Sequence, residues 1–319
     1  MTTYARLLSY RLPMFRGLDV KAVQRRLSEL GHSPGSVDGA YGPATARAVR
    51  DFQTAKSVTP VDGIVGRITW GALFGGTVAR AADPGAAPGA TADAKGALAA
   101  ELAELKARHS RFPGGVEWRV VREGLIIDDG APERTSGQPQ TVRRIWREYG
   151  AQITKASDEF FVPAELIVAT ICTESGGDAS ARREEPGFTS DVATPHRVST
   201  GLMQTLISTA SETLGKPDVT ARWLAVPANS IRAGTAYIAR QRPQTDFDPP
   251  VVACAYNAGG VYQQAGRSNR WRMRQYPIGT GKHADRFVQW FGDCLAVFAE
   301  LDTAGGGEVP GISFHNLLR

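Results

Sequence analysis

The chain has 319 residues, of which 42% are hydrophobic and 22% charged, and its formal net charge is +5. At roughly 100–200 residues per domain, this length predicts two domains. The composition is typical of globular proteins and excludes a wholly disordered chain or a fibrous repeat. No apolar run approaches the roughly 18 residues needed to cross a bilayer, so we expect no stable membrane insertion. The basic excess suits an anionic polymer, whether nucleic acid, a membrane surface or an acidic cell wall.

The N-terminal segment carries three scattered arginines, Arg6, Arg11 and Arg16, and lacks the apolar core and cleavage site of a signal peptide. We therefore expect a protein that folds in the cytoplasm and depends on another agent for release.

An internal repeat follows this segment. Residues 37–45 (VDGAYGPAT) are echoed by residues 61–69 (VDGIVGRIT). Each copy has the pattern of an Asp-Gly turn, a short apolar step, a second glycine and the start of a helix. Apolar residues recur at helical spacing in residues 18–30, 44–56 and 70–74. These signals predict three helices in a module of about 60 residues, near the lower size limit for independent folding.

The doubled pattern resembles the peptidoglycan-binding domain of many bacterial cell-wall hydrolases. Most of the matching residues are core or turn positions, so the resemblance implies wall binding by residues 1–75 without assigning individual contacts. The matching residues are Leu27, Leu30, Gly31, Asp38, Gly39, Tyr41, Gly42, Thr45, Ala48, Val49, Phe52, Gln53, Asp62, Gly63, Val65, Gly66, Thr69 and Leu73.

Residues 76–96 are rich in Ala, Gly and Pro and predict a flexible linker. Such a linker would hold a second domain near an insoluble substrate at high effective concentration.

The second domain is expected over residues 97–319. The sequence predicts a helix from Ala97 to His109, a small β-hairpin within residues 116–128 and a helical stripe along residues 142–160. Residues 295–301 are expected to close the domain, and the Gly-rich tail after them is expected to be loosely held. The predicted fold class is mostly α, with a three-helix binding module and an α-helical domain that carries a small β-hairpin.

The cysteines Cys172, Cys254 and Cys294 lie far apart in apolar stretches and form no Cys-x-x-Cys pair. They predict three buried free thiols rather than a disulfide framework or a zinc site.

A candidate general acid lies at the end of an apolar helix. Pro163 opens this predicted helix, and residues 166–172 are apolar on nearly every side, which indicates a buried helix. The helix ends at Glu174-Ser175, before two glycines. A carboxylate there is removed from water and lies at the negative end of the helix dipole, so its pKa is expected to rise, as a general acid requires. Taken alone, Glu174 is better explained as a solvent-exposed helix end, because Glu is seldom buried.

Two further motifs change that balance. Residues 200–205 (TGLMQT) follow a polar loop, and residues 255–260 (AYNAGG) end another apolar helix. In this order, the three motifs resemble the lysozyme-like superfamily, nearest to soluble lytic transglycosylases and goose-type lysozymes, over residues 141–300. The resemblance implies that Glu174 is the catalytic acid. It would protonate the glycosidic oxygen between N-acetylmuramic acid and N-acetylglucosamine as an oxocarbenium-like transition state forms.

The resemblance also implies substrate-site roles for Ser175, Met203, Gln204, Tyr256 and Asn257. Gln204 is expected to hydrogen-bond an acetamido group, and the Tyr256 phenol is expected to hold the acid in orientation. Structural alternatives remain open for three of these residues. Met203 can be core packing, Asn257 can cap a turn, and Tyr256 can be a buried phenol with a partnered hydroxyl.

The interval between Glu174 and Gly201 is longer than in a typical transglycosylase and rich in charge. A transglycosylase uses one acid/base and lets the muramyl 6-hydroxyl attack. An inverting hydrolase needs a second carboxylate, roughly 6.5–9.5 Å from the acid, to activate water. Asp191, slightly ahead of Glu184 and Glu185, is the candidate, although most charges in such a loop are solvated. His196 has no second histidine at ligand spacing, so neither a metal nor another cofactor is expected.

Residues 267–286 interleave six basic residues with Trp271 and Tyr276. Nucleic-acid binding is one interpretation. A groove wall for a carboxylate-bearing glycan explains the pattern equally well and is favoured by the neighbouring motifs, so no nucleic-acid partner is expected.

Together these features predict a monomeric muramidase that cleaves the β-1,4 bond of peptidoglycan. The modular order and the missing signal peptide favour a bacteriophage endolysin, held in the host cytoplasm until it is released to the cell wall. The alternatives are a lytic transglycosylase that gives 1,6-anhydro products, a non-catalytic phage structural protein that anchors to the wall, and a secreted effector or wall-remodelling enzyme.

Overall fold

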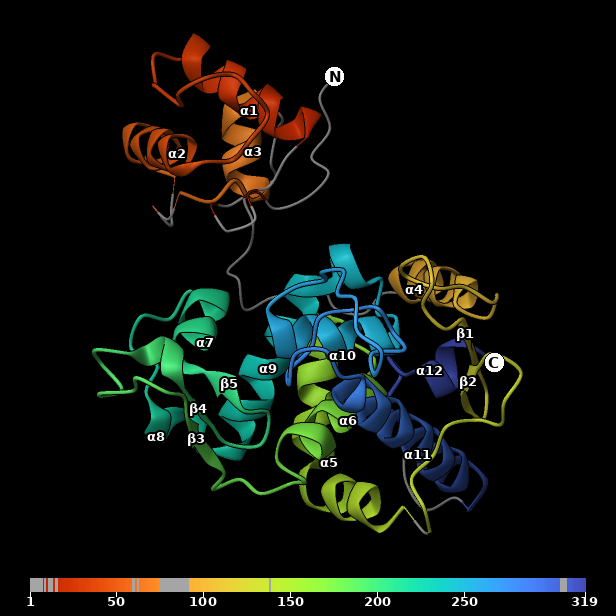
Figure 1. The fold of residues 1–319 in the computed structure, drawn as a ribbon. Helices are drawn as coiled ribbons and strands as arrows, with labels where there is room; N and C mark the ends of the chain where they lie inside the picture. Colours follow the sequence, from red (N-terminus) through yellow and green to blue (C-terminus); the bar gives the residue numbers. More distant parts are fainter. Residues whose placement is uncertain are drawn as a thin grey trace. The chain divides into compact units, whose positions relative to one another are not determined.

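The computed structural model describes residues 8, 10, 14, 17–58, 61, 63–74, 92–137, 139–304 and 309–319. The chain divides into two compact units, Met1–Pro84 and Gly85–Arg319 (Figure 1). Most of the N-terminal segment with its three arginines lies outside the described residues, as does the expected linker up to residue 91. The linker boundaries therefore stay a prediction.

The first unit contains three helices, α1 (Leu18–Glu29), α2 (Pro43–Ala55) and α3 (Arg67–Phe74), as the sequence predicts. They enclose an apolar cluster that includes the fully buried side chains of Tyr41 and Phe52. Pro43 stands in the first turn of α2, where its missing N–H costs no helical hydrogen bond.

A buried glutamine closes the first copy of the internal repeat. The Gln24 side chain is 1% exposed. Its Oε1 accepts the Gly39 N–H at 2.8 Å, and its Nε2 donates to the carbonyl of Ala40 and to Oγ1 of Thr45. The amide thus joins the Asp-Gly turn to the first turn of α2 and satisfies polar groups that would otherwise be buried without partners.

Gln53 does the same in the second copy. Its Oε1 accepts the Gly63 N–H at 2.9 Å, and its Nε2 donates to the Ile64 carbonyl and to Thr69 Oγ1. Gly63 has φ +72, and a Cβ there would lie 2.7 Å from the carbonyl oxygen of Ala46, so a glycine is required at this turn. In each copy of the repeat, a glutamine side chain thus fixes the Asp-Gly turn against the helix that follows it.

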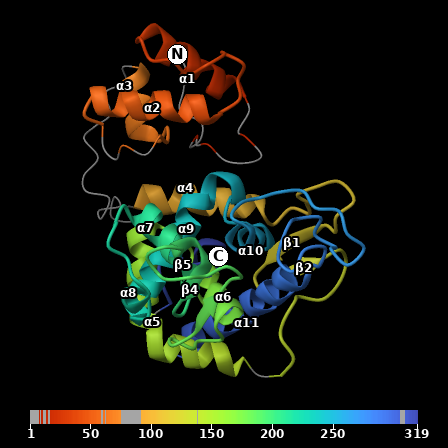
Figure 2. The same ribbon diagram turned by 60° about the vertical axis from the view of Figure 1, so that its left-hand side comes forward.

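The second unit is built around one buried helix, α6 (Ala164–Glu174), as expected for so apolar a segment. Its residues 164–173 are all buried. It packs against α5 (Gln140–Phe160), α9 (Pro227–Thr245), α10 (Pro249–Ala258) and α11 (Lys282–Ala304) (Figure 2). The described residues of this unit also form α4 (Ala92–Glu104), α7 (Ile207–Leu214), α8 (Ala221–Leu224), α12 (Phe314–Leu317) and a short 3-10 helix, η1 (Pro195–Arg197).

Several boundaries differ from the sequence predictions. Helix α4 begins at Ala92 and ends at Glu104, so it starts and stops earlier than the helix expected from Ala97 to His109. The short closing segment expected at residues 295–301 is the end of a much longer helix, α11. The three cysteines are buried and free, as predicted. Among the described residues, no helix has both the length and the apolarity to cross a bilayer.

Two small antiparallel sheets complete this unit. The predicted hairpin is formed by β1 (Trp118–Val121) and β2 (Gly124–Ile127). The second sheet, not expected from the sequence, has the order β3 (Arg182–Glu184), β4 (Val198–Thr200) and β5 (Thr205–Leu206). Every residue of β3 is exposed and charged, so the strand lacks the apolar alternation that would predict it. Its pairing with β4 defines it instead.

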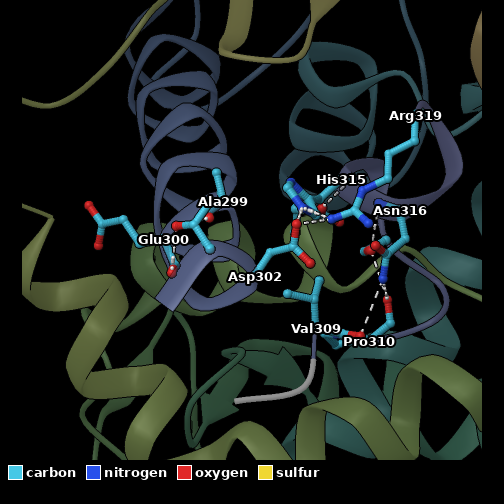
Figure 3. A network of polar contacts seen from close by, with 11 residues as sticks. Ala299, Glu300, Asp302, Val309, Pro310, His315, Asn316 and Arg319 are labelled. Atoms are coloured by element: carbon cyan, nitrogen blue, oxygen red, sulfur yellow. Dashed lines mark hydrogen bonds and ion pairs between the residues drawn. The ribbon is translucent and has the colours of Figure 1, made fainter. Parts of the chain in front are cut away.

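The C-terminal tail is packed, which corrects the expectation that it is loosely held. In its described part, residues 309–319, the side chains of Ile312 and Phe314 are buried. Both carboxylate oxygens of Glu165, in the first turn of α6, accept backbone N–H groups of the tail, from Phe314 and His315, at 2.9 Å each. Figure 3 shows the tail side chains gathered around Asp302, near the end of α11. The tail is thereby attached to the central helix, a long-range contact that the sequence alone does not reveal.

Candidate active site

A cavity of about 560 Å³ lies in the second unit, beside the C-terminal end of α6. Its walls come from β3 to β5 and the loops between them, from α7, α9 and the end of α10, and from the loop that precedes α11. Its lining combines charged side chains with three tyrosines. The lining residues are Glu174, Arg183, Glu185, His196, Ser199, Gln204, Thr205, Leu206, Thr209, Tyr237, Tyr256, Asn257, Ala258, Gly259 and Tyr276.

Glu174 is the last residue of α6, and its side chain is only 18% exposed. The helix stops there because Gly176 and Gly177 adopt left-handed conformations, with φ of 63° and 87°. Burial raises the pKa of Glu174 to about 7, against the opposing positive charges of Arg286 and Arg183. The pKa is therefore shifted in the direction expected from the sequence, and a carboxyl in this state can donate a proton near neutral pH.

The end of α6 is held by side chains from other parts of the domain. Arg286 of α11 donates to the Thr173 carbonyl, one of the carbonyls that a helix end leaves without a helical partner. Ser175 donates its hydroxyl to the Leu202 carbonyl at 2.7 Å. Ser175 was predicted to contact substrate, but it is not among the residues that line the cavity. Its hydroxyl joins α6 to the loop that carries the second motif.

Met203 lies in the core rather than in the groove predicted for it. Its side chain is fully buried against Gly234, where a Cβ would come within 2.5 Å of Met203 Sδ. The core-packing alternative for this residue therefore agrees with its position.

Gln204 lines the cavity, but its amide is used within the loop. Nε2 donates to the carbonyls of Ala181 and Gly201, both at 2.8 Å, and Oε1 accepts the Ser199 hydroxyl at 3.0 Å. Both hydrogens of the amide are therefore engaged, and the expected bond from this amide to an acetamido group has no free donor. The side chain fixes the shape of the cavity wall.

Tyr256 does not hydrogen-bond the acid. Its hydroxyl donates to the Met203 carbonyl at 2.8 Å and lies 3.0 Å from Thr205 Oγ1. Burial, with the nearby charge of Glu174, raises the pKa of Tyr256 well above its ordinary value. The phenol therefore supports the loop beside Glu174 rather than the carboxyl itself.

Asn257 follows Tyr256 and also has a supporting contact. Its Oδ1 accepts the backbone N–H of Tyr276, so it fixes the loop whose exposed aromatic ring forms part of the cavity wall. Both Asn257 and Tyr276 line the cavity.

The three candidates for a second carboxylate take different positions. Asp191 and Glu184 both pair with Arg182, at 2.9 Å, and neither lines the cavity. Glu185 does line it. Its side chain is 42% exposed and pairs with Arg183 Nε at 3.0 Å. Glu185, rather than Asp191, is therefore the carboxylate that shares the cavity with Glu174.

Several side chains of the basic segment at residues 267–286 make ion pairs and hydrogen bonds within the protein. Arg270 pairs with Asp285 at 2.8 Å, and Arg272 donates to a backbone carbonyl at 2.9 Å. Trp271 is fully buried and donates its ring N–H to Asp285. From this segment, Tyr276 is the residue that lines the cavity. The groove-wall interpretation therefore applies to Tyr276 and not to the arginines.

Sequence reasoning missed two residues of this region. Tyr237 of α9 lines the cavity and packs edge-on against Tyr256, with ring centroids 5.3 Å apart. His283, in the first turn of α11, places Nε2 3.6 Å from Glu174 Oε1. Tyr237 stands in no motif, and His283 lies in the basic segment at residues 267–286 without being singled out there, so their positions follow only from the packing of α9 and α11 against the rest of the domain.

The site is thus a buried carboxyl at the end of a buried helix, open to a cavity in an α-helical domain. Residues 151–277 match the family model of the transglycosylase SLT domain, and residues 16–73 match that of the peptidoglycan binding domain. Two separate stretches of the chain thus match a peptidoglycan-binding module and an SLT-type domain, in that order.

Two further similarities are limited in extent. An uncharacterised protein from the bpoA1 3′ region of Kitasatospora aureofaciens is 47% identical over 55 residues, which are 17% of this chain and 46% of that protein. The chain therefore matches less than half of that relative's length. The crystal structure of the Burkholderia AP3 phage endolysin aligns with 92% of this chain and 100% of its own, at 18% identity and a TM-score of 0.23. That score is too low to establish a shared arrangement.

Proposed function

We propose that this protein cleaves the glycan strands of peptidoglycan at the β-1,4 bond between N-acetylmuramic acid and N-acetylglucosamine, with Glu174 as general acid and base. The observation that carries the proposal is the state of Glu174. It lines the cavity, and burial raises its pKa to about 7. The match of residues 151–277 to the SLT domain supports the same substrate.

The chemistry requires Glu174 in both protonation states. As the protonated acid, it donates its proton to the glycosidic oxygen, the C–O bond breaks, and the muramyl ring acquires oxocarbenium character. As the resulting carboxylate, it takes a proton from the oxygen that then attacks the same carbon. That oxygen is the muramyl 6-hydroxyl in transglycosylation and water in hydrolysis. A pKa near the working pH suits both steps.

The transglycosylase reaction, which leaves 1,6-anhydro ends, has more support than hydrolysis. It needs a single acid/base, and it is the reaction named by the matched SLT family. Asp191, the second carboxylate favoured from the sequence, pairs with Arg182 outside the cavity lining. Hydrolysis stays the second candidate because Glu185 lines the same cavity as Glu174.

Mass spectrometry of the muropeptides released from purified cell walls tests both statements. Wild-type protein is expected to release 1,6-anhydro ends, and Glu174→Gln is expected to release nothing while it retains its melting temperature. Glu184→Gln, which changes a carboxylate outside the cavity, is the matched control and is expected to behave as wild type. Retained activity in a folded Glu174→Gln protein would reject the assignment.

Glu185→Gln decides between the two reactions. If reducing ends are found and disappear in Glu185→Gln, the enzyme is a hydrolase with Glu185 as its base. If anhydro ends persist in this variant, transglycosylation stands. If wild type and Glu174→Gln both release no muropeptides while wall binding is intact, the non-catalytic anchor is favoured.

We further propose that the first unit holds the enzyme on the wall and that the protein acts as a phage endolysin. The match of residues 16–73 supports wall binding, and the order of the two modules supports the biological role. Sedimentation of the Glu174→Gln protein with intact cell walls measures binding without cleavage. Lysis that begins only when the inner membrane of a producing cell is permeabilised is expected for an endolysin. Lysis that requires secretion would contradict that role.

A further inference from the structure

The first turn of α11 lies against the end of α6 that carries Glu174. His283 and Arg286 stand three residues apart on α11, so they share one face of the helix. Arg286 donates to the Thr173 carbonyl. His283 is 12% exposed in its side chain, and its Nε2 lies 3.6 Å from Glu174 Oε1. This face therefore contacts both the backbone and the carboxyl at the end of α6.

The His283 ring is uncharged in the range where Glu174 titrates. Burial and the charge of Arg286 lower the pKa of His283 to about 4, whereas the pKa of Glu174 is raised to about 7. The N-terminal end of α11 also disfavours a cation, since the helix dipole is positive there. A neutral imidazole has one N–H donor and one acceptor nitrogen. The ring therefore acts on Glu174 through the direction of a hydrogen bond and not through a positive charge.

We propose that His283 is a positioning residue for Glu174, directing its Nε2–H at Oε1 so that the transferable proton is held on the other carboxyl oxygen. The inference rests on the proposed function. The opposite tautomer would accept the Glu174 proton at Nε2 and turn it away from the sugar. With Nε2–H as donor, the same contact also stabilises the carboxylate left after proton transfer.

The distance is consistent with such a role in the free enzyme. A separation of 3.6 Å is longer than a hydrogen bond, but contacts of catalytic groups are often long without substrate and shorten when it binds. His283 therefore acts through Glu174 and makes no contact with the sugar. Its removal is expected to lower the rate of the chemical step and to leave substrate affinity unchanged.

Three substitutions in the full-length protein test this role. His283→Leu removes the donor, and kcat is expected to fall about tenfold, the effect of one lost hydrogen bond, with KM within about twofold of wild type. His283→Gln keeps an amide N–H at a similar reach and is expected to recover most of kcat. His283→Asn, whose amide ends one carbon earlier, is expected to resemble Leu. Asn and Gln give the comparison by themselves if the Leu protein does not fold.

His315→Gln controls for stability because it removes another buried histidine from the same unit. It is expected to lower the melting temperature without lowering kcat. A His283→Leu protein with wild-type kcat would overturn the proposal, as would a Gln protein as slow as the Leu protein. If Glu174→Gln is inactive while His283→Leu is fully active, this inference fails alone. If Glu174→Gln is active, the proposed function itself fails.

Discussion

At the scale of single residues, two opposing effects determine the pKa of Glu174: burial raises it, and the charges of two arginines lower it. The acid form is lost as the pH rises through that pKa. We therefore expect kcat/KM for wall cleavage to decline above about pH 7, as for any general acid that must be protonated. A rate profile that is flat across neutral pH would contradict Glu174 as the acid.

Arg183→Gln is expected to move this alkaline limb to higher pH because it removes a positive charge that lowers the pKa of Glu174. Arg182→Gln is the matched control. It lies next to Arg183 on β3, pairs with Glu184 and Asp191, and does not line the cavity. The pH profile of kcat/KM measures both variants. A shift of equal size in both would show that the change is not specific to Arg183.

Tyr237 lines the cavity, and its hydroxyl makes no hydrogen bond within the described part of the chain. We expect it to bond the substrate, so Tyr237→Phe should lower kcat/KM about tenfold and leave the melting temperature unchanged. Tyr256→Phe provides the contrast because its hydroxyl already bonds Met203 and Thr205. That variant should lose stability. Wild-type kinetics in Tyr237→Phe would remove Tyr237 from the binding site.

The sequence identifies residues whose signal is local. Glu174 is such a residue because an apolar helix, a carboxylate and two glycines stand together in the chain. The second motif also identifies Met203 and Gln204, but the Met203 side chain packs in the core and the Gln204 amide makes hydrogen bonds within the loop. His283 and Tyr237 carry no local signal. They reach the site through the packing of α11 and α9, which depends on the whole domain.

At the scale of elements, helix α6 carries an ionisable group near each end. Burial raises the pKa of Glu165 from its ordinary 4.5 to about 7. A folded-state pKa above the unfolded one means that the stabilising contribution is full below the unfolded value and is lost as the pH rises through the folded value. We expect the free energy of unfolding of this unit to fall by up to about 3 kcal/mol between about pH 5 and pH 8 from this group alone.

Glu165→Gln tests that expectation, since a neutral amide resembles the protonated acid at every pH. The variant should unfold in urea with a smaller dependence on pH than wild type. Glu174 contributes a change of the same sign, so part of the dependence remains. Identical pH dependence in the two proteins would show that Glu165 titrates normally in the folded state.

The two repeated turns of the first unit make a matched pair of experiments. Gln53→Leu would leave the buried Gly63 N–H without the side-chain oxygen to which it donates. We expect a loss of about 1–3 kcal/mol in the stability of the binding module. Gln24→Leu should cost a similar amount because Gln24 closes the equivalent turn. Calorimetry of the full chain is the measurement, and the transition of the second unit should not move.

The repeat predicts the two turns but not the glutamines that fix them. The turns are visible as two copies, but Gln24 lies 15 residues before its glycine and Gln53 only 10 before its own. The glutamines therefore fall outside the repeat period. The β3–β4–β5 sheet is hidden for another reason. Its first strand is fully exposed and charged, so pairing rather than burial pattern defines it.

At the scale of the whole molecule, the order of the modules follows from sequence because each module has its own motifs and its own core. The path of the C-terminal tail does not. The tail follows a glycine run, its polar groups contact side chains of α6 and α11, and its short helix α12 packs against α4 and α11. Contacts at this separation along the chain leave no periodic signal, so only the packed domain reveals them.

Removal of residues 305–319 is expected to unfold or strongly destabilise the second unit. The deletion uncovers the surfaces that bury Ile312 and Phe314, worth about 1.5–3 kcal/mol for each side chain. It also leaves the carboxyl of Glu165 buried without the two N–H groups that it accepts. Such a group costs about 1–3 kcal/mol or more. The melting temperature of the second unit should fall, and wall cleavage should be lost at temperatures where wild type is active.

Arg319→Gln is the control for this deletion because it removes one partly exposed ion pair with Asp302 and leaves the buried tail in place. Its effect should be within about 1 kcal/mol, as for other surface pairs. Binding of the truncated protein to intact cell walls should persist because the first unit has a separate core. If the truncated protein keeps both the melting temperature and the cleavage rate of wild type, the tail does not stabilise the central helix. A loss of wall binding together with cleavage would instead show that the two units depend on each other for folding.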